Sequence, residues 1–369
     1  MKFIPVAQPS LGKEELKLAT FCIKSTWISS AGKYINTFEN EFAKYFHIPH
    51  AISCSNGTIA LHLALLALNI GPGDEVILPA LTFVATANAI KYVGAKPIFI
   101  DVDPNTWNID PKLIEKAITK KTKAIMPVHL YGYPADMNPI MSLAKKYKLY
   151  VVEDAAEAHG AKYYNKYVGT FGDIGCFSFY GNKIITTGEG GMLITHSKQL
   201  AEKIKLLKNH GMSPIKKYYH PIIGYNYRMT NIQAAIGIAQ LKKMNKFIKI
   251  RNEISTKYRK ELTKIPNIQF QPINKDIQSV CWLFSCLLKS GGKIKRNSLI
   301  KYLKQNSIDS RPFFYPITKF PMYKSNKHFP VSQMLFQQGI NLPTFIDLKT
   351  TQIKYITHII NKFYSKSTE

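Results

Sequence analysis

The chain has 369 residues, of which 46% are hydrophobic and 20% charged, which excludes a single small core and predicts two globular domains, or one large domain with an appendage. The formal net charge is +27, but the lysines are scattered along nearly all predicted helices and no dense arginine block is present. The charge therefore indicates a composition bias rather than the clustered footprint of a nucleic-acid-binding face, although a basic surface still attracts anionic small molecules such as nucleotides.

Strand and helix patterns alternate over the first two thirds of the chain. In chain order the pattern predicts strand 75–79, helix 82–94, strand 96–102, helix 110–118, strand 123–131, helix 137–148 and strand 149–155. Alternation with short connections is typical of parallel strands that are covered by helices on both faces. The predicted fold class is therefore α/β.

The remainder of the chain completes this large unit and predicts a second, smaller one after it. Two short strands, 176–180 and 191–196, precede a helix that closes at Gly211. At Thr230 the stretch TNIQ matches a capping box, which begins a long helix that runs to about residue 265. We place a domain boundary inside this helix, so that a large α/β domain spans 1–245 and a small C-terminal α+β domain spans 246–369.

The five cysteines form no CxxC pair, and their odd number predicts buried, reduced thiols. The first residues lack the apolar core of a signal peptide. The longest apolar run, IALHLALLALNI, has 12 residues, whereas a membrane-spanning helix needs about 17 to 25. We therefore expect a cytoplasmic protein with no membrane partner and no nucleic-acid partner.

The stretch CFSFYGNKIITTGEGGML, residues 176–193, contains one lysine, Lys183, between two apolar runs. Four glycines in this stretch remove side-chain bulk and allow close approach of the backbone to a ligand. A lysine amine becomes a nucleophile when its pKa is lowered, or when it condenses with an aldehyde to a Schiff base. We expect covalent chemistry at Lys183; the alternative is a surface lysine beside a glycine turn.

Asp154 follows the apolar run LYVVE, at the carboxyl end of a predicted central strand. Open α/β sheets bind their ligands at this edge. A carboxylate there can keep a proton on a pyridine nitrogen, and the alternative is a structural or helix-capping aspartate. Glu157 and His159 follow closely and would flank the same pocket, although a lone histidine is more often part of a core.

The stretch SNGTIALHLALLAL, residues 55–68, leads from a small polar turn directly into an apolar helix. The backbone N–H groups of Asn56, Gly57 and Thr58 would face outward at the helix start and suit a phosphate group. The alternative is ordinary helix capping by Ser55 or Thr58.

Phe83 follows the strand 75–79 and would stack on a flat ring, unless it packs in the core. Ser178, five positions before Lys183, would donate to the same phosphate as the helix start. An amine, an acid for a ring nitrogen, a phosphate cradle and an aromatic cover together match pyridoxal 5′-phosphate (PLP). No metal motif, P-loop or dinucleotide fingerprint is present, so no metal is expected.

The chain resembles the DegT/DnrJ/EryC1/StrS sugar aminotransferases, which are fold-type I PLP enzymes. The likeness runs almost from end to end and includes STWISSAGKYINTFENEFA, SNGTIALHLALLAL, GDEVILPALTFVATANAI, VVEDAAEAHGA, VGTFGDIGCFSFYGNKIITTGEGGM and GYNYRMTNIQAAIGIAQL. Within the family it is most similar to the GDP-perosamine synthase group, which shares STWISS, YNYRMTN and SRPFFYP. Relatives that remove a hydroxyl carry histidine in place of Lys183, so the lysine implies transamination.

The resemblance implies a role for each candidate residue. Lys183 would hold PLP as a Schiff base, and Asp154 would pair with the pyridine nitrogen. The other implied cofactor contacts are Asn56, Gly57, Thr58 and Ser178 at the phosphate, Phe83 over the ring, Glu157 near the ring, and Asn226 at the phosphate in a neighbouring subunit. The implied substrate contacts, carried by weaker matches, are His159, Arg228 and Arg311.

The implied reaction moves the amino group of L-glutamate to the 4-keto carbon of a nucleotide-linked 4-keto-6-deoxy sugar. With GDP-4-keto-6-deoxy-D-mannose the product would be GDP-perosamine, a precursor of O-antigen and lipopolysaccharide. A homodimer with shared active sites is also implied. A dTDP- or UDP-linked keto sugar remains the alternative substrate, and a non-catalytic protein of the same fold that binds PLP or nucleic acid is the alternative of another class.

Overall fold

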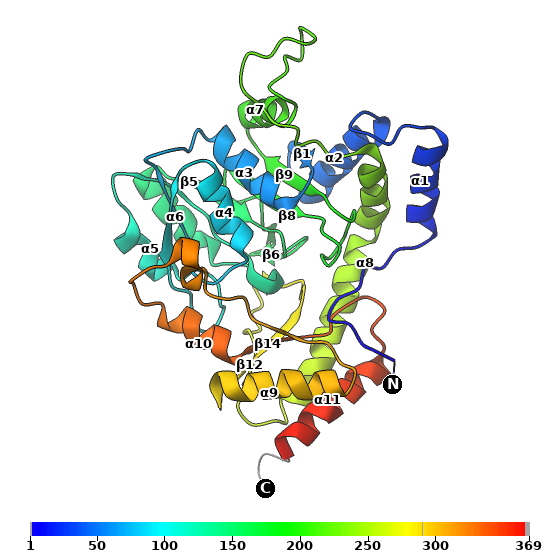
Figure 1. Cartoon of the computed structure of the whole chain (residues 1–369), viewed down its shortest axis with the longest axis vertical. Helices are drawn as coiled ribbons and strands as arrows, with labels where there is room; N and C mark the ends of the chain where they lie inside the picture. The colour runs from blue at the N-terminus through cyan, green and yellow to red at the C-terminus, as the bar shows by residue number, and fades with distance from the viewer. Residues whose placement is uncertain (1, 290, 366–369) are drawn as a thin grey trace.

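The computed structural model describes residues 2–289 and 291–365 (Figure 1). Its centre is a seven-stranded sheet in the order β1-β9-β8-β5-β4-β2-β3. These strands are β1 His50–Cys54, β2 Glu75–Pro79, β3 Lys96–Ile100, β4 Thr122–Ile125, β5 Tyr150–Asp154, β8 Ile174–Ser178 and β9 Gly191–Thr195. β9 runs antiparallel to β1 and β8, and the other neighbours are parallel, which confirms the predicted α/β class.

Alternating side chains of each strand feed two cores on opposite faces of the sheet, because successive residues of a strand point to opposite sides. In β5, Val151 belongs to one core and Val152 to the other. Helices α3, α4 and α7 cover the Val152 face, and α2, α6 and the start of α8 cover the Val151 face. The helices of this part are α1 Lys13–Lys24, α2 Lys33–Phe46, α3 Gly57–Ala67, α4 Val84–Tyr92, α5 Pro111–Ala117, α6 Met137–Tyr147 and α7 Lys198–Lys208.

Two strand predictions differ from the structure next to the sheet edge. The run predicted as strand 123–131 is a strand only up to Ile125; a single parallel bridge from Val128 to Asp154 follows, and then a 3₁₀ turn, η1 Leu130–Gly132. Tyr131 in this turn has a left-handed backbone with φ 55°. The strand predicted over 176–180 is β8 and ends earlier, at Ser178, so Lys183 lies in the turn that follows it.

The helix start predicted at residues 55–58 is present, but its cap is Asn56 rather than Ser55 or Thr58. The Oδ1 atom of Asn56 accepts a 2.9 Å hydrogen bond from the backbone N–H of Ile59. The capping box at Thr230 is confirmed, with Gln233 as its second member.

The helix that Thr230 caps, α8 Asn231–Leu262, leads from the large sheet to α9 and α11 (Figure 1). The remaining elements are β6 Lys162–Tyr163, β7 Lys166–Tyr167, β10 Ile268–Gln269, β11 Ile277–Gln278, β12 Phe284–Leu288, α9 Gly292–Gln305, β13 Arg311–Pro312, η2 Ile317–Lys319, η3 Pro321–Tyr323, α10 Pro330–Gln338, β14 Gly339–Leu342 and α11 Thr350–Ser365. β10, β12, β14 and β13 form a second sheet, and β11, β6 and β7 a third. A boundary at residue 245 stays a prediction, because α8 runs through it without a break.

Three further features of the described residues are an exposed arm, the state of the cysteines and the character of the helices. Residues 211–224 form an arm that projects beyond α7 (Figure 1) and exposes Ile215, Tyr218 and Ile223. All five cysteines are free and buried, as predicted. Across 2–289 and 291–365, no helix has the length and apolar character needed to span a membrane.

Candidate active site

Asp154 is the last residue of β5 and lies buried at the carboxyl edge of the large sheet. Its Oδ2 atom accepts a 2.7 Å hydrogen bond from the Thr86 hydroxyl, and its Oδ1 atom accepts one of 3.2 Å from the N–H of Ala156. Burial raises the pKa of the Asp154 carboxyl, and the hydrogen bond from Thr86 opposes that rise. Thr86 therefore favours the charged form that a pyridine nitrogen would need.

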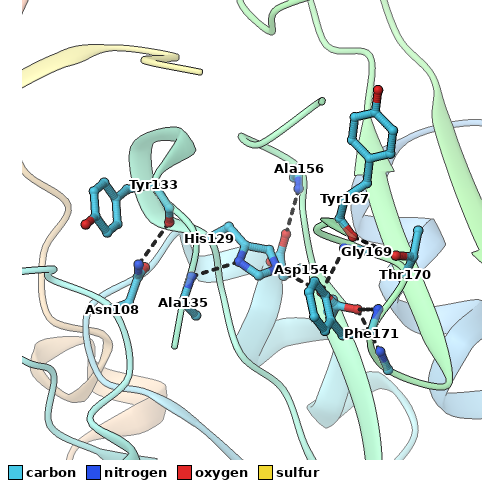
Figure 2. A network of polar contacts seen from close by, with 12 residues as sticks. Asn108, His129, Tyr133, Ala135, Asp154, Ala156, Tyr167, Gly169, Thr170 and Phe171 are labelled. Carbon is cyan, nitrogen blue, oxygen red and sulfur yellow. Dashed lines mark hydrogen bonds and ion pairs between the residues drawn. The ribbon is translucent and has the colours of Figure 1, made fainter. Parts of the chain in front are cut away.

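The strand end that carries Asp154 is fixed by a fully buried hydrogen bond between the preceding residue, Glu153, and His129, whose ring lies in the network of Figure 2. His129 Nδ1 accepts a 3.0 Å hydrogen bond from the N–H of Ala135, so the ring proton sits on Nε2 and points to Glu153, 3.1 Å away. Both oxygens of Glu153 also accept backbone N–H groups of the 169–172 turn. These bonds satisfy a buried carboxylate and hold the residue before Asp154 in place.

Lys183 reaches the same edge from the turn after β8. Its side chain is 12% exposed, and its Nζ atom lies 3.8 Å from Oε1 of Glu157. The ring of Trp282 lies on another side, with its centroid 4.0 Å from Nζ. Burial lowers the pKa of the Lys183 amine, while Glu157 and Asp154 act in the opposite direction. A lowered pKa is what a lysine needs in order to react as a neutral amine.

Glu157 is buried and accepts a 2.8 Å hydrogen bond from the N–H of Tyr131. Burial raises its pKa to about 7, against the lowering effect of Lys183. Glu157 and Lys183 therefore form a pair in which each charge depends on the other.

The start of α3 lies directly against the end of β8. A Cβ atom on Gly57 would lie 2.6 Å from Cβ of Ser178, so only glycine allows this approach. The first N–H groups of a helix have no partner within the helix, and they attract anions. The buried hydroxyl of Ser55 has no hydrogen-bond partner within the part of the chain that the structure describes. A narrow cradle with unused donors fits the phosphate of PLP.

Phe83 is the residue before α4 and is 54% exposed, with its ring 5.6 Å from that of Phe314. It is therefore not a core residue, which was the alternative. An exposed aromatic face beside the sheet edge is available to a flat ligand ring.

Asn226 and Arg228 contact each other on the segment that follows the arm. Arg228 Nε and Nη2 donate to Oδ1 of Asn226 at 3.1 and 2.8 Å, and Nη1 donates to Asn209. The N–H of Ser55 donates to the carbonyl of Tyr227, so this segment adjoins the start of α3. Among the described residues, the hydrogen bonds of the Arg228 guanidinium involve only Asn226, Asn209 and His210.

His159 is closed off from solvent, and Arg311 is paired with another side chain. His159 is fully buried, with its ring 5.3 Å from that of Phe177, and within the described chain neither ring nitrogen has a hydrogen-bond partner. Burial lowers its pKa to about 3. The Arg311 side chain is 62% exposed and forms a 3.0 Å ion pair with Asp309. We therefore do not carry either residue forward as a substrate contact.

Sequence reasoning missed Thr86, Tyr131 and Trp282, all of which contact the candidate residues. Thr86 stands three positions after Phe83 in the same motif, which was the only local signal. Trp282 and Tyr131 lie in apolar runs that are typical of a hydrophobic core.

A family model for the DegT/DnrJ/EryC1/StrS aminotransferase family matches residues 9–361. A GDP-perosamine synthase of Escherichia coli O157:H7 is 51% identical over 99% of this chain and 100% of its own, and one of Caulobacter vibrioides is 46% identical over 95% of both. A crystal structure of an aminotransferase from Psychrobacter cryohalolentis has a TM-score of 0.92 at 31% identity, with both chains covered completely.

A sugar aminotransferase of Streptococcus pneumoniae in its PLP form has a TM-score of 0.94 at 27% identity over 99% of both chains. These likenesses confirm the predicted aminotransferase class, the fold-type I architecture and PLP as the cofactor. The chain belongs to the DegT/DnrJ/EryC1/StrS aminotransferase family.

Proposed function

We propose that the protein transfers the amino group of L-glutamate to the 4-keto carbon of GDP-4-keto-6-deoxy-D-mannose and thereby makes GDP-perosamine. The observation that carries the reaction is the cluster of Lys183, Glu157 and Asp154 at the sheet edge. The choice of sugar is supported by three relatives, 44–51% identical over at least 95% of this chain, that are named GDP-perosamine synthase.

PLP, when bound, supplies an electron sink and carries the amino group between the two substrates. Lys183 would hold the cofactor and, once freed, move a proton between the substrate carbon and the cofactor as base and acid. Asp154 would keep the proton on the ring nitrogen, with Thr86 orienting its carboxylate. Glu157 would tune the charge of the Lys183 amine from 3.8 Å away.

The cofactor phosphate would be held where α3 meets β8. Asn56, Gly57 and Thr58 would offer the helix start and Ser178 its hydroxyl. Phe83 would cover the ring from the exposed side.

We also propose a homodimer in which Asn226 of one subunit serves the phosphate site of the other. The apolar side chains that the arm exposes, Ile215 and Ile223 among them, support burial against a second copy. Work in the cytoplasm, in the synthesis of O-antigen and lipopolysaccharide, would follow from the product.

A second candidate substrate is a UDP-linked keto sugar. A relative from Acidithiobacillus ferrooxidans, 39% identical over 90% of this chain, is named UDP-N-acetyl-3-dehydro-alpha-D-glucosamine 3-aminotransferase. That name concerns carbon 3 rather than carbon 4, so both the nucleotide and the position of the new amine need a test. A dTDP-linked sugar belongs in the same comparison. The non-catalytic alternative is not carried forward, because the family is one of enzymes.

The test is to incubate the protein with PLP, L-glutamate and each of the GDP-, dTDP- and UDP-linked keto sugars, and to analyse the products by mass spectrometry and NMR. We expect turnover with the GDP sugar and an amine at carbon 4. Faster turnover of a UDP or dTDP sugar, or amination at carbon 3, would replace the proposed substrate without changing the reaction.

A further inference from the structure

Trp282 makes two contacts with the lysine turn from a part of the chain 100 residues away. Its indole Nε1–H donates a 2.7 Å hydrogen bond to the carbonyl of Asn182, the residue before Lys183. Its ring centroid lies 4.0 Å from Nζ of Lys183. Because the indole is almost fully buried, both contacts are shielded from water.

The backbone around Trp282 is tied down on both sides. Its N–H donates to the carbonyl of Tyr131 at 3.1 Å, and its carbonyl accepts a 2.7 Å hydrogen bond from Nη1 of Arg251 on α8. Arg251 is itself buried, and the same Nη1 also donates to the carbonyl of Thr344. The buried guanidinium of Arg251 therefore fixes the backbone of Trp282 and, through it, the position of the indole.

Tyr131 forms hydrogen bonds with both Trp282 and Glu157 through its backbone. Tyr131 donates its N–H to Glu157 and accepts from the N–H of Trp282 through its carbonyl. Tyr131 has φ 55° and Cys281, next to Trp282, has φ 46°, a region that residues other than glycine seldom adopt. Such conformations persist where the surrounding structure enforces them, often at functional sites.

The two neighbours of the Lys183 amine both favour its charged form. Glu157 offers a carboxylate, and the face of an indole attracts a cation more strongly than any other side-chain ring. Burial favours the neutral amine; the charges of Glu157 and Asp154 oppose that effect, and the indole face acts in the same direction as the two carboxylates.

We propose that Trp282 is a positioning residue for Lys183: its indole N–H fixes the Asn182 carbonyl, and its ring holds the free ammonium group next to Glu157. The proposal rests on the proposed function only in taking Lys183 as the reactive amine. It gives the enzyme a defined resting place for the lysine whenever the amine is not bound to cofactor.

The test measures the reactivity of Lys183 in the full-length protein after removal of PLP. Acetic anhydride labels neutral amines, so the labelling rate of the Lys183 peptide against pH, followed by mass spectrometry, gives the midpoint of the amine titration. In Trp282→Leu, loss of the ring destabilises the ammonium, and we expect the midpoint to fall by about one pH unit. In Trp282→Phe the fall should be smaller, because an aromatic face remains.

Trp282→Phe also removes the donor to Asn182. We expect kcat to fall about tenfold or more with little change in the KM of either substrate, because the lysine is misplaced and substrate binding is not affected. Trp107→Phe is the matched control: this indole is buried, and its N–H has no acceptor in the described residues, so both readouts should stay at wild-type values.

A midpoint that is unchanged or raised in both Trp282 variants, with the fold intact by circular dichroism, would overturn the proposal. The labelling experiment needs no sugar turnover, so its result stands even if the proposed substrate is wrong. If Trp282→Leu does not fold, Trp282→Phe decides by the same two measurements.

Discussion

The hydroxyl of Thr86 donates a 2.7 Å hydrogen bond to Oδ2 of Asp154, and both residues are buried. Thr86 Oγ1 also lies 3.1 Å from the Thr82 hydroxyl, so the two threonines form a short chain that ends on the carboxylate. A carboxylate that accepts such a bond stays charged more easily in a buried site.

We expect Thr86→Val to weaken PLP binding about tenfold or more, because a hydrogen bond to a charged group contributes about 1.5–3 kcal/mol. Without the donor, the already raised pKa of Asp154 rises further, and less of the carboxylate is charged at neutral pH. The dissociation constant of PLP from the variant, titrated by absorbance, measures the effect. Thr86→Ser keeps the hydroxyl and should bind like the wild type; equal weakening in both variants would assign the loss to packing.

Gly57→Ala tests the phosphate cradle. The added methyl would lie 2.6 Å from Cβ of Ser178 and would push the start of α3 away from β8. We expect PLP affinity to fall about tenfold while the affinity for pyridoxal, which lacks the phosphate, stays the same. Gly71→Ala, where the nearest atom is 3.7 Å away, is the control. Equal losses for PLP and pyridoxal would count against a phosphate site at Gly57.

Lys183→Ala should abolish turnover while the fold is kept, because no other described amine lies within ion-pair distance of Glu157. In the wild type, borohydride reduction with PLP should attach the chromophore to the peptide that contains Lys183. Lys198→Ala, at an exposed helix position, should retain full activity. Native-rate transamination by the Lys183 variant would remove this residue from the mechanism.

Glu157→Gln should make the Lys183 amine neutral at a lower pH. Glu157 raises the pKa of Lys183, and an amide supplies no charge, so we expect a downward shift of the midpoint. The measurement is the pH dependence of PLP capture by the cofactor-free protein. Glu115→Gln, which removes an exposed carboxylate, should leave that dependence unchanged. An upward shift in Glu157→Gln would show that the pair is not coupled as described.

His159→Leu should reduce the loss of stability in acid. Burial lowers the pKa of His159 to about 3, so below its usual value of 6.5 the unfolded chain binds a proton that the folded chain refuses. Stability therefore falls as the pH drops from 6.5 towards 3, and is unaffected by this group at higher pH. Without the histidine, the loss between pH 7 and pH 5 should shrink by about 2 kcal/mol.

Urea unfolding of the wild type and of His159→Leu at both pH values measures this difference. His196→Asn, at an exposed position, serves as the control and should behave like the wild type. A variant that loses as much stability as the wild type on acidification would mean that His159 becomes protonated in the folded chain.

The strands next to the site were predictable because their signals are local. β2 was predicted at its observed bounds, since a fully buried run of five residues follows the polar, glycine-rich stretch GPGD. Asp154 follows such a run in β5, which places it at the ligand-binding edge. β9 carries the same kind of apolar run, yet it is antiparallel. The sign of its antiparallel direction is the connection from β8, which contains no helix, whereas the crossover between two parallel strands usually does.

The contacts that shape the site were not predictable in the same way. Thr86 reaches Asp154 across 68 positions and Trp282 reaches Asn182 across 100. Such pairings arise from how whole elements pack, and neither the spacing of the two partners in the sequence nor their residue types predicts them. The burial of His159 was equally hidden, because its ring packs on Phe177 and Phe179, which lie in and directly after β8.

Tyr131 gives the site an unusual mechanical property. Its N–H binds the carboxylate of Glu157, and its carbonyl accepts from the backbone N–H of Trp282, so a rotation of the Tyr131 backbone displaces both neighbours of the lysine together. A substrate that moves the Tyr131 backbone would therefore change both the polarity and the shape around the Lys183 amine. A mutation at position 131 would displace Glu157 and Trp282 together.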